Sequence, residues 1–273
     1  MPISSTDSSV TDGFCVVIPV YNHERTVADV VRRTLDLGLP VIVVDDGSTD
    51  ASYERIKDMA GIRILRHRPN RGKGAALMTG FLQAEKTFVW AITLDADGQH
   101  DPRDAKSLMA AIPPEVRPIV VGCRQNMRAA AAPLTSRFGR GFSNFWVRIS
   151  GGPAVTDSQS GFRVYPLPES LHLGTQSRRF QFEVEILVGA KANGIPVIEA
   201  PVSVSYQPGT PRISHFHPVE DFLRNFGLFS RLITGRVVNR IFRSKKMTRP
   251  HDSRKPRRGH QDCARGAEGL KPL

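Results

Sequence analysis

The chain has 273 residues, 40% of them hydrophobic, which is enough for one large α/β domain or two small ones with a buried core. Its 38 Lys and Arg outnumber its 26 Asp and Glu, and the net charge of +12 suits a polyanion or an anionic membrane surface. The polar start of the chain is unlike a signal peptide, no apolar run reaches the roughly 20 residues that span a bilayer, and the three Cys residues lack metal-site spacing. We therefore expect a cytoplasmic protein, either soluble or at the cytoplasmic face of a membrane.

Short apolar runs alternate with helical patterns through most of the chain. The predicted strands cover residues 14–19, 41–44, 62–65, 88–92, 119–122 and 201–206. Strands that alternate with helices favour an α/β fold with a mostly parallel central sheet and helices on both faces. The loops after the first, second and fourth strands should then open at one edge of the sheet, where ligands of such sheets bind.

Two carboxylates, Asp95 and Asp97, directly follow the fourth predicted strand. Alternation along a strand places both side chains on the same side. Neighbouring carboxylates repel each other unless a positive charge lies between them, and a hard divalent cation that also binds phosphate oxygens is the usual occupant. The pattern indicates a metal and diphosphate site, although an isolated Asp-Ala-Asp also fits a solvated turn.

A glycine-rich segment, Asn70-Arg-Gly-Lys-Gly74, precedes the third predicted helix. A P-loop would need Ser or Thr at position 74, and a dinucleotide fingerprint would need glycine where the chain has Leu77. Neither an NTPase nor an NAD enzyme is supported.

Five motifs in order resemble the family 2 glycosyltransferases, and the dolichyl-phosphate mannose synthase and polyprenyl-phosphate glycosyltransferase branch most of all. These motifs are Val17-Ile-Pro-Val-Tyr-Asn-His-Glu24, Val43-Val-Asp-Asp-Gly-Ser-Thr-Asp50, Asn70-Arg-Gly-Lys-Gly74, Asp95-Ala-Asp-Gly-Gln-His100 and Asp157-Ser-Gln-Ser-Gly-Phe-Arg163. The resemblance covers about residues 14–206. It implies a GT-A fold, a nucleoside-diphosphate sugar as donor, Mg²⁺ or Mn²⁺ as cofactor, and inversion at the sugar carbon.

The resemblance also implies which residues bind the nucleoside of the donor. They are Pro19, Tyr21, Asn22, Glu24 and Asp46. Asp46 is expected to read the base, although its carboxylate also suits the cap of the following helix.

Four residues are implied at the diphosphate and sugar of the donor. Lys73 is expected near the donor, and Asp95 is expected to contact the ribose or the sugar. Asp97 is expected to bind the metal as a catalytic residue, with Gln99 beside it as a second ligand. On the residues alone, a solvated charge at Lys73 and a turn residue at Gln99 remain open.

The second half of the resemblance concerns the acceptor. Arg124 and Arg137 match arginines that grip the acceptor phosphate in the polyprenyl-phosphate branch, and the planar fork of arginine suits a phosphate. Arg212 resembles a late basic residue that closes over the donor diphosphate. Asp157 is the candidate base if the acceptor is a hydroxyl, because a phosphate oxygen is already an anion near neutral pH. Solvated arginines at 137 and 212, and a turn-fixing carboxylate at 157, stay open.

The sequence predicts four segments. Residues 1–13 are expected to be disordered, 14–206 to form the GT-A catalytic domain, 207–246 to form a donor-closing loop and a basic amphipathic helix, and 247–273 to form a disordered basic tail. The apolar stripe of the predicted helix would lie in a membrane interface or pack on the catalytic domain.

These patterns together predict an inverting, metal-dependent glycosyltransferase that moves a sugar from a GDP- or UDP-sugar to a lipid phosphate. A hydroxyl acceptor, with Asp157 as base, is the first alternative. A non-catalytic protein that binds membrane or nucleic acid through its basic tail is the second, but the tail lacks the interleaved aromatic residues of single-strand binders. We therefore expect a peripheral membrane contact and no nucleic-acid partner.

Overall fold

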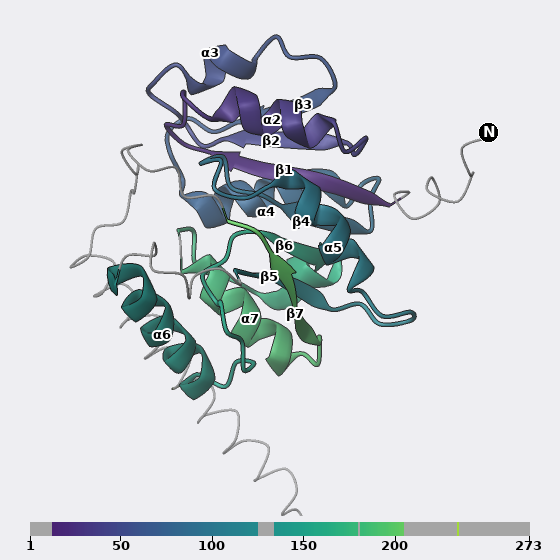
Figure 1. Cartoon of the computed structure of the whole chain (residues 1–273), viewed down its shortest axis with the longest axis vertical. Helices are drawn as coiled ribbons and strands as arrows, with labels where there is room; N and C mark the ends of the chain where they lie inside the picture. The colour runs from purple at the N-terminus through teal and green to yellow at the C-terminus, as the bar shows by residue number, and fades with distance from the viewer. Residues whose placement is uncertain (1–12, 125–133, 180, 205–233, 235–273) are drawn as a thin grey trace, which may run out of the picture. The chain divides into compact units, whose positions relative to one another are not determined.

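The computed structural model describes residues 13–124, 134–179, 181–204 and 234, and its central element is a seven-stranded sheet (Figure 1). The strands are β1 (Phe14–Val20), β2 (Val41–Asp45), β3 (Ile62–Arg66), β4 (Trp90–Thr93), β5 (Ile119–Arg124), β6 (Arg163–Pro166) and β7 (Val197–Val202). Their order across the sheet is β3-β2-β1-β4-β6-β5-β7.

The sheet is mostly parallel, as predicted. The four neighbours β3, β2, β1 and β4 pair in parallel, and β5 pairs in parallel with β7. Only β6 runs the other way, because it pairs antiparallel with both β4 and β5. The carboxyl ends of β2, β1 and β4 therefore lie side by side at one edge.

Helices cover both faces of the sheet. They are α2 (Val27–Leu35), α3 (Ser52–Ile56), α4 (Lys73–Ala84), α5 (Ala105–Ala110), α6 (Leu134–Ile149) and α7 (Phe182–Ala192), with 3₁₀ turns η1 (Pro102–Asp104) and η3 (Glu169–Leu173). Along β1, Val16 and Ile18 join a core with α2, α3 and α5, whereas Cys15 and Val17 join a second core with α4 and α7. A strand buried on both faces needs a continuous apolar run, which explains the sequence of β1.

The main differences from the predicted strands lie in three places. The last strand lies at Val197–Val202 instead of 201–206, and β4 lies at Trp90–Thr93 instead of 88–92. The antiparallel β6 was not predicted, because it has four residues and begins with a charged one. Arg163 is fully buried there and donates hydrogen bonds to the carbonyls of Ser158 (2.8 Å) and Glu183 (2.9 Å). Its charge is thus satisfied by backbone carbonyls, which no apolar pattern reveals.

The predicted N-terminal segment, donor-closing loop, amphipathic helix and basic tail lie outside the described residues, apart from residues 13 and 234. Within the described part of the chain, no helix is both long and apolar enough to cross a bilayer.

Candidate active site

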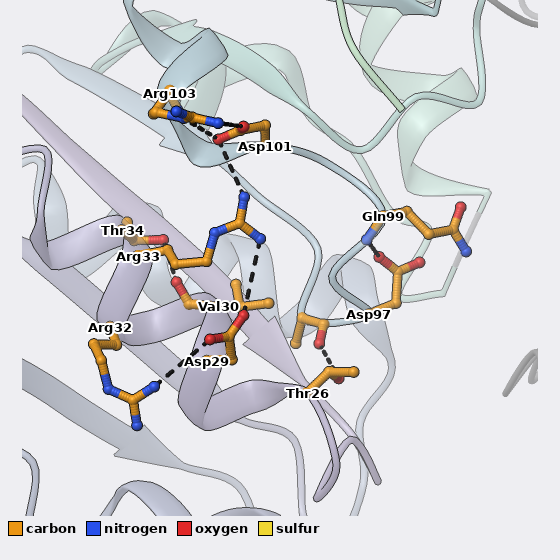
Figure 2. A network of polar contacts seen from close by, with 11 residues as sticks. Thr26, Asp29, Val30, Arg32, Arg33, Thr34, Asp97, Gln99, Asp101 and Arg103 are labelled. Atoms are coloured by element: carbon orange, nitrogen blue, oxygen red, sulfur yellow. Dashed lines mark hydrogen bonds and ion pairs between the residues drawn. The ribbon is translucent and has the colours of Figure 1, made fainter. Parts of the chain in front are cut away.

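The loops that follow β1, β2 and β4 meet at one edge of the sheet, which confirms the predicted convergence. Loop 21–24 and loop 46–52 are joined by hydrogen bonds, among them one from the His23 amide to Ser52 Oγ at 2.7 Å. The third loop joins them where Thr26 Oγ1 donates to the Ala96 carbonyl at 2.6 Å (Figure 2). The three loops therefore form one connected surface.

Two of the predicted nucleoside residues hold these loops together. Asn22 has a φ of 57°, and its side-chain oxygen accepts a hydrogen bond from the Thr49 amide at 2.8 Å. Glu24 Oε2 accepts from the Ala51 amide at 3.1 Å. Sequence reasoning missed this structural role. Contact with a nucleoside stays a prediction for both, as it does for Pro19 and Tyr21 in the same stretch.

Asp46 binds the glycine-rich loop and not the helix that follows β2. Its side chain is almost completely buried, and it accepts hydrogen bonds from the His67 ring (2.6 Å), the Arg71 amide (2.9 Å) and the Gly72 amide (2.7 Å). Three donors occupy most of the acceptor capacity of one carboxylate. The alternative that Asp46 caps the following helix is thus wrong. Contact between Asp46 and the nucleobase of the donor stays a prediction, and it would use a carboxylate that already accepts hydrogen bonds from this loop.

The glycines of the loop allow it to pack closely on the chain ahead of α7. A Cβ at Gly72 would lie 2.4 Å from the Arg178 carbonyl oxygen, and one at Gly74 would lie 2.6 Å from Phe182 Cβ. The Ala75 amide in the first turn of α4 donates to that same Arg178 carbonyl at 3.0 Å. The sequence pattern therefore marks a packing contact as well as a possible phosphate loop.

We expect Gly72→Ala to destabilise the fold by about 2–4 kcal/mol, because Gly72 combines a φ of 97° with this backbone clash. Gly38→Ala is the matched control, since Gly38 has a φ of 72° and nothing within 4 Å of the added Cβ. It should cost only about 1 kcal/mol. Urea unfolding of the two variants measures the difference, and equal losses would contradict the packing role.

Lys73 joins the glycine-rich loop to two carboxylates. Its ammonium lies 2.6 Å from Asp95 Oδ1 and 2.6 Å from Glu183 Oε1 on α7. Burial would lower the pKa of Lys73, but the charges of Asp95 and Glu183 outweigh burial and raise that pKa. Lys73 is thus a fixed cation at the Asp95 carboxylate, and the solvated alternative is wrong.

Asp95 is confined on its other side by the motif that begins at Asp157. A Cβ at Gly161 would lie 2.3 Å from Asp95 Oδ2, so glycine leaves room for the carboxylate. The Thr93 hydroxyl donates to the Gly161 carbonyl at 2.7 Å and holds the two segments together. Burial opposes ionisation of Asp95, but Lys73 outweighs it, so the pKa of Asp95 is lowered and the carboxylate stays charged.

A nearby cation would stabilise the ionised form of Asp97. Burial, and then the negative charge of Asp95, raise the pKa of Asp97. Its Oδ1 accepts a hydrogen bond from the Gln99 amide at 3.0 Å, which holds it in the turn (Figure 2).

The residues present fit a divalent metal that keeps part of its coordination for other oxygens. Among the described residues, no three or more His, Cys, Asp or Glu side chains are grouped to hold a metal ion. Mg²⁺ and similar cations are commonly held by one or two carboxylates together with substrate phosphates and water. Asp97, with the side-chain oxygen of Gln99 as the predicted second ligand, matches that type of site.

The far end of this loop is fixed to α2 through Asp101. Asp101 accepts a hydrogen bond from the Arg103 amide at 3.0 Å and pairs with Arg33 at 3.2 Å (Figure 2). The Arg103 side chain above all lowers the pKa of Asp101 to about 2. The loop that carries Asp95 and Asp97 is thus held at both ends.

Asp157 and Arg124 form a two-pronged ion pair, which favours a positioning role for Asp157, and its role as a base for a hydroxyl acceptor stays a prediction. Arg124 Nε lies 2.5 Å from Asp157 Oδ2, and Arg124 Nη2 lies 2.7 Å from Oδ1. The Asp157 side chain has no exposed surface, whereas that of Arg124 is 13% exposed. A carboxylate with both oxygens on one guanidinium is less well placed to take a proton from an acceptor. The pair orients Arg124.

His100 is a buried residue of the loop after β4 that was not assigned a role from the sequence. Burial lowers its pKa against the opposing charges of Asp95 and Asp97. The charge of Arg124 also lowers it. The charges of the two carboxylates and of the arginine therefore all act on the His100 ring. Arg137 lies on α6 with its side chain outside the described part, and Arg212 also lies outside it.

The model of the family named Glycosyl transferase family 2 matches residues 15–136 of the chain. The UDP-N-acetylglucosamine–dolichyl-phosphate N-acetylglucosaminyltransferase of Methanococcus voltae is 32% identical over 218 residues, which cover 70% of this chain and 85% of the relative. The dolichyl-phosphate beta-glucosyltransferase ALG5A of Trichomonas vaginalis is 27% identical over 248 residues, which cover 82% of this chain and 76% of the relative.

A solved structure with a similar fold is glucosyl-3-phosphoglycerate synthase from Mycobacterium tuberculosis, in complex with Mn²⁺ and UDP-glucose. The TM-score is 0.58 at 19% sequence identity, and the match covers 88% of this chain and 84% of that one. This likeness confirms the predicted GT-A fold.

Proposed function

Because the chain belongs to glycosyl transferase family 2, we propose that it transfers a sugar from a nucleoside-diphosphate sugar to a polyprenyl phosphate. The relatives named above act on dolichyl phosphate, and this supports a lipid phosphate as the acceptor. The observation within the structure that carries the proposal is the Arg124–Asp157 pair, because the motif that begins at Asp157 also packs against the Asp95 carboxylate at Gly161.

The donor would bind across the joined loops after β1, β2 and β4. Asn22, Glu24 and Asp46 give this surface its shape, and Lys73 keeps Asp95 ionised for contact with the ribose or the sugar. Mg²⁺ or Mn²⁺ held by Asp97 and Gln99 would stabilise the negative charge that develops on the departing diphosphate. The activity would therefore depend on metal.

The acceptor would be bound as an anion by Arg124. The nearby carboxylates are already used within the protein: Asp157 binds Arg124, Glu183 binds Lys73, and Glu199 accepts from the Thr156 and Asp157 amides. A hydroxyl acceptor needs a base, but a phosphate oxygen attacks without one. The arrangement thus favours a phosphate over an alcohol.

Transfer then consists of one displacement. The acceptor oxygen, positioned by Arg124, forms a bond to the sugar carbon on the face opposite the departing diphosphate, so the configuration of that carbon inverts. Lys73 and the loop at Asp97 hold the donor side still, and most of the rate enhancement comes from positioning and charge stabilisation.

We expect the purified chain to glycosylate a polyprenyl phosphate and to leave the matching polyprenol unmodified. The lipid product is separated and identified by mass spectrometry, with both acceptors presented in the same detergent. An equal rate on the polyprenol would contradict the phosphate acceptor. Reaction with the polyprenol alone would also restore the need for a base.

A further inference from the structure

The inner side of α6 is bound to the segment around Asp157 and to α7. Asn144 Nδ2 donates to the Thr156 carbonyl at 2.7 Å, and the hydroxyls of Ser143 and Ser158 lie 2.9 Å apart. Val147 is fully buried in a small cluster with two valines of α7. These contacts fix which side of the last two turns of α6 faces the domain.

The outer side of the same turns is apolar and exposed. Phe145 is 56% exposed and Ile149 is 41% exposed, and residues four apart on a helix lie on the same side. Arg148 lies between them in sequence and is also exposed. We call Phe145, Arg148 and Ile149 the α6 outer face.

The charge of α6 favours an anionic surface as the occupant of this face. The segment Leu134–Ile149 contains three arginines, at positions 137, 140 and 148, and no acidic residue. A second copy of the chain would bring a net charge of +12 towards that basic helix, which opposes self-association. An anionic bilayer instead attracts the arginines and accepts the two apolar side chains.

The position of α6 connects this face to the acceptor. Thr156 and Ser158, which bind α6, flank Asp157, and Asp157 holds Arg124. A polyprenyl chain remains in the bilayer, so its phosphate reaches Arg124 only if this side of the domain lies at the membrane surface. Helix α6 is therefore hydrogen-bonded directly to both neighbours of Asp157.

We propose that the α6 outer face docks on the surface of an anionic lipid bilayer, with Phe145 and Ile149 inserted at the interface. The proposal rests on the proposed function, because the lipid acceptor is the reason to expect a membrane at this face. Binding to vesicles, however, is measured without any sugar transfer. Docking of the α6 outer face on the bilayer would thus position the catalytic domain over the phosphate of its acceptor.

The test is sedimentation of the full-length chain with vesicles of equimolar phosphatidylglycerol and phosphatidylcholine. We expect the double variant Phe145→Ser, Ile149→Ser to bind these vesicles at least about tenfold more weakly than the unchanged chain. Leu82→Ser is the matched control, because Leu82 is 51% exposed on α4, and its binding should not change. Unchanged binding of the double variant, or an equal loss in the control, would overturn the proposal.

Thermal unfolding decides whether the chain itself covers this face. Serine at exposed positions should leave the melting temperature within about 2 °C of the unchanged chain. A fall typical of core substitutions would show that another segment of the chain packs there, and would overturn the proposal.

Transfer assays separate this proposal from the proposed function. With a short, water-soluble prenyl phosphate, the double variant should retain the rate of the unchanged chain, whereas its rate on a long polyprenyl phosphate in vesicles should fall about tenfold. If the double variant had the same rate as the unchanged chain on both acceptors, this result would contradict membrane docking. Absence of transfer by the unchanged chain would contradict the proposed function and leave the vesicle binding result to stand by itself.

Discussion

Asp97→Asn is expected to lower the turnover of sugar transfer by about a thousandfold, because a neutral amide is a much weaker ligand for a divalent cation. The substitution conserves volume and removes a partly buried carboxylate whose pKa is raised by burial and by Asp95. The variant should therefore fold at least as well as the unchanged chain. Initial rates at saturating donor and acceptor measure the effect.

Two controls make the Asp97 result specific. Asp29→Asn removes a carboxylate that is 60% exposed on α2, and it should leave turnover within about twofold. Mn²⁺ should raise the melting temperature of the unchanged chain but not that of Asp97→Asn, since only a bound ligand stabilises the fold. If Asp97→Asn keeps its turnover and its response to Mn²⁺, Asp97 does not hold the metal.

Asp157→Asn is expected to lower kcat/KM for the lipid-phosphate acceptor by about a hundredfold, mainly through KM. The variant breaks the two-pronged pair and lets the Arg124 guanidinium turn away from the acceptor. Loss of one partner of a buried ion pair should also lower the stability of the fold by about 3 kcal/mol. Donor binding, measured by calorimetry, serves as the internal control and should change little.

The shape of the pH–rate profile separates positioning from proton transfer. If Asp157 positions Arg124, the profile of Asp157→Asn keeps its shape, and Arg124→Lys shows the same rise in KM. Combining the two substitutions should cost less than the sum of the single losses, because both remove the same interaction. A loss confined to kcat, with disappearance of the acid limb of the profile, would support Asp157 as a base.

The parallel half of the fold and its loop edge follow from local patterns in the sequence. Buried strands such as β1 read as apolar runs, and strands that alternate with helices place successive loops at one edge. Strand alternation predicts that the two carboxylates after β4 share a side, although Asp95 and Asp97 in fact follow the end of that strand at Thr93. Each of these inferences depends on residues that are close in the sequence.

The contacts that complete the donor side and the acceptor side join residues that are far apart in the sequence. Lys73 and Glu183 are 110 positions apart, and Arg124 and Asp157 are 33 apart. The positions of these residues depend on the antiparallel strand β6. This strand has no continuous apolar pattern in the sequence, because it contains the buried Arg163. Sequence reasoning therefore found Asp157 as a site residue but could not find Arg124 as its partner.

The Gly161 position shows how a motif can be recognised before its physical reason is known. The sequence marks it only as part of a turn after Asp157. The structure shows that a Cβ there would collide with the Asp95 carboxylate. The motif that begins at Asp157 thus packs directly against the Asp95 carboxylate. A larger side chain at position 161 should therefore displace Asp95.

The most direct test of a metal-dependent sugar-transfer site at this sheet edge is a transfer assay with the full-length chain. Polyprenyl phosphate is incubated with each GDP- and UDP-sugar in turn, in Mn²⁺ and in excess chelator. We expect a lipid-linked sugar phosphate from at least one donor, formed with Mn²⁺ and lost in chelator. Formation at the same rate in chelator, or no lipid-linked product from any of these donors, would contradict it.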